Sequence, residues 1–212
     1  MMKNFPVFPT AHGVASLILK EIPYRGEAYI RIQSTQEPRA LLEECIAFCT
    51  ACGAEKVYAS GHAILEDYPL HTSVYRMTGQ LQLQEQNVPA MFPVTEQTVG
   101  KWREHYNRRM QNVDNAATLE QRDEQEILAG GAYFIHQDGE PLGIGWLEEN
   151  KIRAIASLQP GAGEQVCRAM QSLIPRQQMT LEVASTNRRA ISLYERLGFL
   201  KVEELARWYQ VK

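Results

Sequence analysis

The apolar positions of the C-terminal half change their spacing along the chain, and each spacing predicts a particular element. Apolar side chains three and four residues apart, as at Val99 and Trp102, predict an amphipathic helix from about Glu96 to Val113. Short apolar runs on either side of Asp138-Gly139 predict a β-hairpin, because this dipeptide favours a tight turn. In full, helices are predicted over residues 96–113, over 119–128, from about 163 and over 187–197, and strands over residues 132–136, 141–147, 151–158, 179–184, 199–204 and 207–211.

The N-terminal half predicts a shorter series in the order β-β-α-β. Its elements are strands over residues 15–22 and 27–32, a helix over residues 38–53 and a strand over residues 56–60. The strands Lys56–Ser60 and Leu181–Ser185 have similar sequences, and each follows a helix that follows a hairpin, so an internal duplication is predicted. The first copy lacks a glycine loop before its helix. The Gln-rich stretch Gly79–Pro89 is the predicted boundary between a partial first domain, residues 1–80, and a second domain, residues 81–212.

The composition is that of an ordinary globular protein and narrows the choice of partners. The chain has 212 residues, of which 44% are hydrophobic and 22% charged. A net charge of −3 and a pI of about 6.0 provide no field that would attract nucleic acid or an anionic membrane. The N-terminal apolar run Val14–Leu19 is too short for a membrane span or a signal segment. We therefore expect a cytoplasmic protein with no nucleic-acid or membrane partner, and the sequence leaves its oligomeric state open.

Three cysteines raise the question of a metal cluster. Cys45, Cys49 and Cys52 have the C-x3-C-x2-C spacing with which radical SAM enzymes bind an iron–sulfur cluster. Such a cluster needs a loop, whereas here the spacing predicts a helix on which the three thiols share an apolar stripe with Leu41 and Phe48. Reduced core thiols and no metal are therefore predicted, with an iron–sulfur enzyme as the alternative.

A segment near the C-terminus combines a strand, a capped helix and a glycine at fixed spacing. Asn187 stands where an N-cap is expected, and Gly198 is placed to end the helix. Tyr194 shares a helical stripe with Ile191 and Leu197, so its spacing alone indicates a core aromatic. The pattern Asn-x-x-Ala-x-x-Leu-Tyr-Glu-x-x-Gly-Phe is complete at Asn187, Ala190, Leu193, Tyr194, Glu195, Gly198 and Phe199.

This pattern closely resembles the signature of the GNAT acetyltransferases, and the order of the preceding elements also fits their fold. The resemblance covers roughly Val88 to Lys212. It implies an α/β fold with a mixed, mostly antiparallel central sheet flanked by helices, the acyl-CoA N-acyltransferase fold. It also implies that Tyr194 is catalytic, as a general acid that donates a proton to the departing thiolate of coenzyme A. A phenol suits this role because it is protonated at neutral pH.

The resemblance further implies where the cofactor binds. Asn187 would hydrogen-bond the pantetheine arm, and the end of the strand predicted over residues 151–158 would contact that arm through its backbone. Glycines in the following loop would let the backbone approach the pyrophosphate, which the N–H groups at the helix N-terminus would bind. The implied cofactor-binding residues are Ala156, Ser157, Leu158, Gln159, Gly161, Ala162, Gly163, Glu164, Gln165, Val166 and Asn187.

Two features depart from the family pattern. The loop has one residue fewer between Gln159 and Gly161 than the family loop has. The strand over residues 151–158 contains no acidic residue, so no general base is assigned. The acidic residues that are candidates by neighbourhood are Glu148, Glu149 and Glu182.

We therefore expect an N-acetyltransferase that moves an acetyl group from acetyl-CoA, as co-substrate, to a primary amine by direct attack and without a metal. Cys167 does not indicate an acyl-enzyme, because its sequence neighbours include no histidine base. The alternative is a non-catalytic acyl-CoA-binding or regulatory module with the same fold, which the shortened loop and the missing base favour. The sequence does not identify the acceptor.

Overall fold

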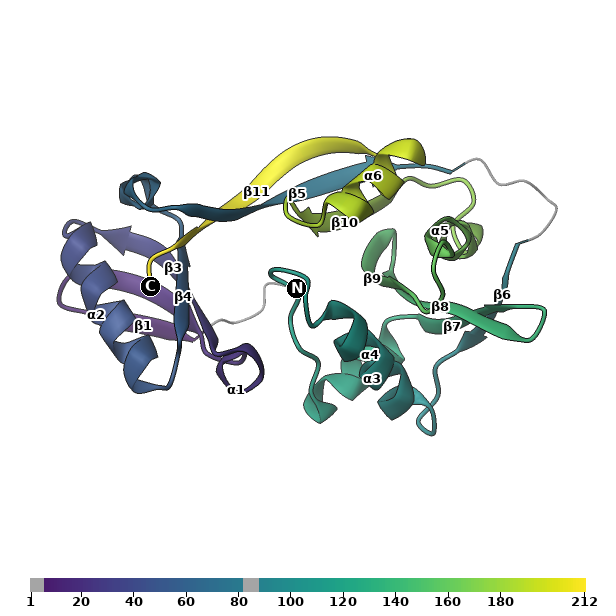
Figure 1. Cartoon of the computed structure of the whole chain (residues 1–212), viewed down its shortest axis with the longest axis horizontal. Coiled ribbons are helices and arrows are strands. Elements are labelled where there is room, and N and C mark those ends of the chain that lie inside the picture. Colours follow the sequence, from purple (N-terminus) through teal and green to yellow (C-terminus); the bar gives the residue numbers. More distant parts are fainter. Residues whose placement is uncertain (1–5, 82–87) are drawn as a thin grey trace. The chain divides into compact units, whose positions relative to one another are not determined.

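The computed structural model describes residues 6–81 and 88–212, and the chain divides into two compact units. Unit 1 comprises Met1–Val74 and Leu205–Lys212, and unit 2 comprises Tyr75–Glu204. Strands β5 (Leu70–Gly79) and β11 (Leu200–Gln210) contribute residues to both units (Figure 1). These units differ from the predicted domain ranges 1–80 and 81–212, because the C-terminal segment packs with the N-terminal elements. The predicted boundary stretch includes residues 82–87, which lie outside the described residues.

Unit 1 contains the predicted β-β-α-β series. Its elements are β1 (Val7–Thr10), β2 (Gly13–Ile18), α1 (Ile22–Arg25), β3 (Glu27–Thr35), α2 (Pro38–Ala51), β4 (Lys56–Ser60), the 3-10 helix η1 (Ala63–Asp67) and parts of β5 and β11. Strands β1, β2 and β3 are antiparallel, β3 and β4 are parallel, and β4 pairs with the end of β11. Helix α2 is the crossover that parallel pairing requires. The descent of the two units from one duplicated ancestor remains a prediction.

The cysteine-bearing helix α2 packs its apolar stripe into the core of unit 1. Cys45 and Cys49 are fully buried beside Leu41 and Leu42. Their burial confirms these two as free core thiols, and it raises the pKa of the Cys45 thiol to about 11 and that of the Cys49 thiol to about 12. Cys52 is exposed, so the prediction that it shares the stripe is wrong: it is the C-cap, beyond the last helical residue. Within residues 6–81 and 88–212, no three His, Cys, Asp or Glu side chains are grouped to hold a metal ion.

Unit 2 is a mixed, mostly antiparallel sheet flanked by helices, as the sequence predicts. Its elements are β6 (Ala90–Pro93), α3 (Val99–Met110), the 3-10 helix η2 (Gln121–Asp123), α4 (Glu124–Ala129), β7 (Ala132–Gln137), β8 (Glu140–Glu148), β9 (Lys151–Ser157), α5 (Gly163–Ser172), β10 (Met179–Ala184), α6 (Arg188–Arg196) and parts of β5 and β11. The strand order is β11-β5-β10-β9-β8-β7-β6. Strands β6 to β9 are antiparallel, whereas β9 and β10 are parallel and are joined through α5.

Two apolar cores lie on opposite faces of the unit 2 sheet. Helices α5 and α6 pack on one face, and α3 and α4 pack on the other (Figure 1). Along β8 the faces alternate, because successive side chains of a strand point in opposite directions. Ile144 and Trp146 lie in the core with α3, and Trp146 meets the Trp102 ring edge-on at 6.1 Å. Gly143 and Gly145, which alternate with them along β8, face α5.

Two glycines of β8 allow α5 to lie directly on the sheet. A Cβ on Gly143 would lie 2.4 Å from Val166 Cγ2 and 2.7 Å from the Ala156 carbonyl oxygen. A Cβ on Gly145 would lie 2.2 Å from Met170 Sδ. Any larger residue would push the helix or its side chains outward. The glycines therefore set the height of α5 above the sheet and, with it, the position of the loop that precedes α5.

Most predicted elements of unit 2 are present, with shifted ends. Strand β10 has the predicted limits, α3 is shorter than residues 96–113, and the helix predicted over residues 119–128 is η2 followed by the short α4. The two strands predicted over residues 199–204 and 207–211 form one strand, β11, because Leu205 and Ala206 between them are not turn-forming residues. Strands β5 and β6 were not predicted. None of the described helices combines the length and apolar character needed to cross a membrane.

Candidate active site

The parallel strands β9 and β10 separate over most of their length. They pair only at Lys151 with Thr180 and at Ile152 with Leu181, although both strands continue for several residues. At the point of separation the register of β9 with β8 also shifts, which leaves Arg153 as an extra residue on β9. Beyond this point the backbone groups along the facing edges do not pair with each other. An opening of this kind can receive an extended, amide-containing chain that hydrogen-bonds to the strand edges.

The loop between β9 and α5 follows the open end of β9. Gly161 has a φ of +84°, a conformation that glycine adopts without steric cost, and a Cβ there would meet no atom within 4 Å. A Cβ on Gly163 would lie 2.7 Å from Leu193 Cδ2 and 3.4 Å from Ser157 Oγ. The structure therefore brings the end of β9, the loop and α6 together, which are the three segments that the sequence singles out.

The first turn of α5 points unpaired backbone donors toward this loop. The first helical hydrogen bond runs from the Val166 N–H to the Ala162 carbonyl at 3.0 Å, so the amides of Gly163, Glu164 and Gln165 have no acceptor within the helix. These donors lie at the positive end of the helix dipole, which favours an anion. The Val166 amide donates within the helix and its side chain is buried, and its predicted contact with the cofactor stays a prediction.

The charge of Glu164, which would repel a phosphate at this position, is compensated. Arg168 lies one turn further along α5 and forms an ion pair with Glu164 at 2.8 Å. The Gln165 side chain bonds to Gln137 at 3.1 Å. Both side chains are therefore held, and the backbone amides of the first turn remain the groups that face the loop.

The backbone near the end of β9 is partly engaged. The Leu158 N–H donates to the Leu142 carbonyl at 2.8 Å, and the Leu158 carbonyl accepts from the Arg109 guanidinium. Leu158 is thus linked to β8 through its N–H and to α3 through its carbonyl, and the contacts of Ala156, Ser157 and Leu158 with the pantetheine arm stay predictions. The Arg109 contact could not be predicted from the spacing of polar residues on α3. It depends on where the end of α3 lies over the sheet.

Helix α6 is capped as the sequence predicts. The Asn187 side-chain oxygen accepts from the Ala190 N–H at 3.3 Å, which confirms Asn187 as the N-cap. Its amide NH2 has no acceptor among the residues that the structure describes and could donate to a ligand. Gly198 ends the helix with a φ of +86°, and the Phe199 N–H returns to the Tyr194 carbonyl at 2.9 Å. These two ends fix the rotation of α6 and so the direction of Tyr194.

Tyr194 is half-buried against the core that α5 and α6 share. Its ring centre lies 5.7 Å from that of Phe199, and within the described part of the chain its hydroxyl makes no hydrogen bond. Burial, and to a smaller extent the neighbouring Cys167, raises the pKa of the Tyr194 phenol. Burial also raises the pKa of the Cys167 thiol to about 12. Both groups therefore stay protonated at neutral pH, which is compatible with the predicted role of Tyr194 as a proton donor and does not favour Cys167 as a thiolate nucleophile.

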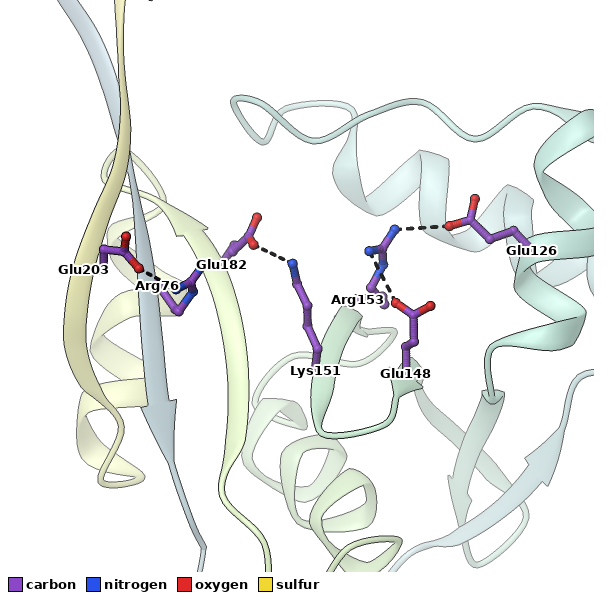
Figure 2. Close-up of polar contacts among 7 residues, drawn as sticks. All are labelled: Arg76, Glu126, Glu148, Lys151, Arg153, Glu182 and Glu203. Carbon is purple, nitrogen blue, oxygen red and sulfur yellow. Dashed lines mark hydrogen bonds and ion pairs between the residues drawn. The ribbon is translucent and has the colours of Figure 1, made fainter. Parts of the chain in front are cut away.

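Ion pairs join β9 to the neighbouring elements where the opening begins (Figure 2). Lys151 on β9 and Glu182 on β10 form an ion pair with 2.5 Å between Nζ and Oε1. Arg153 pairs with Glu126 of α4 at 3.2 Å and with Glu148 of β8 at 3.5 Å. Of the acidic residues that neighbour the site in sequence, Glu148 is therefore held by Arg153, whereas Glu182 lies at the opening itself. Sequence reasoning could not rank them, because each pair joins residues of different elements.

The parallel pair of unit 1 has no corresponding opening. Strands β3 and β4 pair at every position from Glu27 with Lys56 to Arg31 with Ser60, which is the last residue of β4. A hollow of about 370 Å³ lies at this end of β4, with Arg31 and His62 among its lining residues. The strand separation that could receive a pantetheine arm is thus found between β9 and β10 and not between β3 and β4.

Comparisons with known proteins agree with this architecture. Residues 145–208, which include the opening, the loop and α6, match the sequence model of the family described as FR47-like protein. No curated protein matches the sequence. The matched segment is less than half of the chain, and it contains the signature that resembles that of the GNAT acetyltransferases.

Several solved structures share the fold at low sequence identity. A functionally unknown conserved protein from Staphylococcus epidermidis is 10% identical with a TM-score of 0.61, covering 98% of this chain and 93% of that one. A GCN5-related N-acetyltransferase from Anabaena variabilis is 14% identical with a TM-score of 0.59, covering 94% of this chain and 59% of that one. One from Kribbella flavida is 14% identical with a TM-score of 0.54, covering 97% and 88%. At such identities the likeness establishes the acyl-CoA N-acyltransferase fold.

Proposed function

We propose that this protein transfers an acetyl group from acetyl-CoA to the primary amine of an acceptor. The separation of β9 from β10, next to the glycine loop and to α6, the helix that carries Tyr194, is the observation that carries the proposal. The pantetheine arm is an extended chain with two amides, so it can bind along the separated strand edges. The fold and the FR47-like segment support the same assignment.

Different residues around the opening would bind different parts of acetyl-CoA. The backbone of Ala156 and Ser157 and the Asn187 amide would bind the pantetheine arm. The loop, from Gln159 through Gly161 and Ala162, and the first amides of α5 would bind the pyrophosphate, because a helix N-terminus stabilises phosphate charge. Gly161 suits this role because a Cβ at its position meets open space, where a ligand could approach the backbone.

The proposed chemistry is a direct transfer. The acceptor, as a neutral amine, attacks the thioester carbonyl carbon; a C–N bond forms and the C–S bond breaks. Tyr194 donates its proton to the departing thiolate, and the nitrogen releases a proton to water, from which Tyr194 regains its own. Starting from the ammonium form of the acceptor, the products are the amide, free coenzyme A and one proton.

The test combines binding with turnover. Purified protein would be titrated with acetyl-CoA by calorimetry, and thiol release and acetylated products would be measured with a mixture of primary amines. We expect binding and an amine-dependent release of thiol that the Tyr194→Phe variant reduces. Binding without turnover for every amine would favour a non-catalytic acyl-CoA-binding module, and absence of binding would overturn the proposal.

A further inference from the structure

The carboxylate of Glu182 stands at the point where β9 and β10 separate. The last paired residues are Ile152 and Leu181, so Glu182 is the first residue of β10 inside the opening. Leu181 and Val183 on either side of it are buried in the core with α5 and α6. Because side chains alternate along a strand, Glu182 points to the opposite face of the sheet from the one that Tyr194 occupies.

At the opening the two faces of the sheet carry different chemistry, with Tyr194 on the face that α5 and α6 cover and the Glu182 carboxylate on the other. A thioester held between the strands would meet the proton donor Tyr194 from the face with α6. An incoming amine would approach from the other face, where Glu182 offers a negative charge. We infer that Glu182 receives the acceptor's ammonium group and that Lys151 occupies this position until the acceptor displaces it. The inference rests on the proposed function and names a positioning residue for it.

The contact with Lys151 shows that Glu182 can hold a primary ammonium. The Lys151 Nζ lies 2.5 Å from Glu182 Oε1, and the two side chains are 38% and 39% exposed (Figure 2). An ion pair exposed to this degree is weak and exchanges readily with a competing cation, because water and salt screen it. The group that Glu182 holds here, the Lys151 side chain, is an unbranched alkylammonium. The acceptor class that fits is therefore a primary amine at the end of a flexible alkyl chain, as in a lysine side chain or a diamine.

The neighbouring cation does not compete for Glu182. Arg153, the next charged residue on β9, is held by Glu126 and Glu148 and lies over the Trp146 ring with 5.4 Å from its guanidinium carbon to the ring centre. In the described residues, Lys151 is thus the cation paired with Glu182. Removing Lys151 would leave the carboxylate open to an external ammonium.

The same sheet provides a matched control pair. Arg76 of β5 and Glu203 of β11 form an ion pair of the same kind with similar exposure, 41% and 52% (Figure 2). These strands lie on the far side of β10 from the opening. Substitutions in this pair change the surface charge of unit 2 by the same amount but leave the strand opening untouched.

The experiment measures binding of n-butylammonium by NMR titration, to the protein alone and to the protein saturated with coenzyme A. We expect Lys151→Met to tighten binding about 5-fold, the gain from removing an exposed competing pair. Glu182→Gln should weaken binding about 10- to 100-fold, since a charged hydrogen-bond partner is lost. Arg76→Met and Glu203→Gln should bind n-butylammonium with the affinity of the parent. None of the four substitutions should change the binding of the uncharged control 1-butanol.

Two results would overturn the inference: equal n-butylammonium binding by parent and Glu182→Gln, or equal effects of Glu182→Gln and Glu203→Gln. A folded Glu182→Gln variant is expected because the pair is exposed, and Lys151→Met tests the idea with the opposite sign. Failure of the proposed function is distinguishable, because it would abolish coenzyme A binding and leave the titration of the protein alone to report on Glu182. For any primary amine that the protein acetylates, Glu182→Gln should raise the KM for the amine and leave the KM for acetyl-CoA unchanged.

Discussion

The close packing of α5 on the sheet predicts that two substitutions in β8 destabilise the protein, one more than the other. In Gly145→Ala the new methyl group would lie 2.2 Å from Met170 Sδ and 3.0 Å from Met170 Cγ. In Gly143→Ala it would meet Val166 Cγ2 at 2.4 Å and the Ala156 carbonyl oxygen at 2.7 Å. Met170 has rotatable bonds that can absorb part of the clash, whereas a branched side chain and a backbone carbonyl cannot. Gly143→Ala should therefore cost more than Gly145→Ala.

The expected size follows from overpacking a filled core, which costs about 1–3 kcal/mol. For a chain of this length each kcal/mol lowers the melting temperature by roughly 2–4 °C, so the fall should be about 2–12 °C. Thermal unfolding followed by circular dichroism measures it. Gly100→Ala on α3 is the control: its Cβ would meet only Glu124 Oε1, at 3.8 Å, and alanine favours a helix, so stability should rise slightly. Melting of Gly145→Ala at or above the parent temperature, or a smaller loss in Gly143→Ala, would refute this account of the packing.

Three further predictions concern the phenol and the thiols. Tyr194→Phe should lower kcat about 100- to 10,000-fold with little change in acetyl-CoA affinity; an unchanged kcat would return Tyr194 to a packing role. Because burial raises the pKa of Tyr194, it keeps its proton up to at least about pH 10, the ordinary phenol value, so kcat should show no alkaline fall below that pH. A fall centred near pH 8 would assign the proton donor to another group. Replacing Cys45 and Cys49 by Ala should cost about 1–3 kcal/mol together, whereas Cys52→Ala should be near neutral, as measured by urea unfolding; stoichiometric iron in the parent would contradict the assignment of core thiols.

Local sequence rules predict α6 and β10 well, because both depend on neighbours in sequence. Asn187 and Gly198 are capping residues whose preferences act over a few positions, and the structure has both caps in place. Strand β10 has the predicted limits for the same reason: a short apolar run ends where the capped helix begins. The residues with the strongest local signal are thus also those that carry the resemblance.

The opening could not be predicted, because it depends on pairing between distant segments. Periodicity identifies β9 and β10 as strands but does not say that their pairing stops after Ile152. The ion pair of Lys151 with Glu182 joins residues of different strands, so neighbourhood in sequence could not select Glu182 over Glu148. Strand β11 differs from the prediction of two strands for a local reason, because Leu205 and Ala206 do not favour a turn and the strand continues through them.

Stabilisation by acetyl-CoA tests the central claim most directly, because the shortened loop is where this chain departs from the family pattern. If the opening and the first turn of α5 bind the co-substrate, a concentration of 100 times Kd should stabilise the protein by about 2.7 kcal/mol. The melting temperature should then rise by roughly 5–10 °C. Desulfo-CoA should act nearly as well, and Gly161→Val should lose most of the shift, since a branched side chain resists a φ of +84°. No shift of the parent protein at millimolar acetyl-CoA would contradict the account.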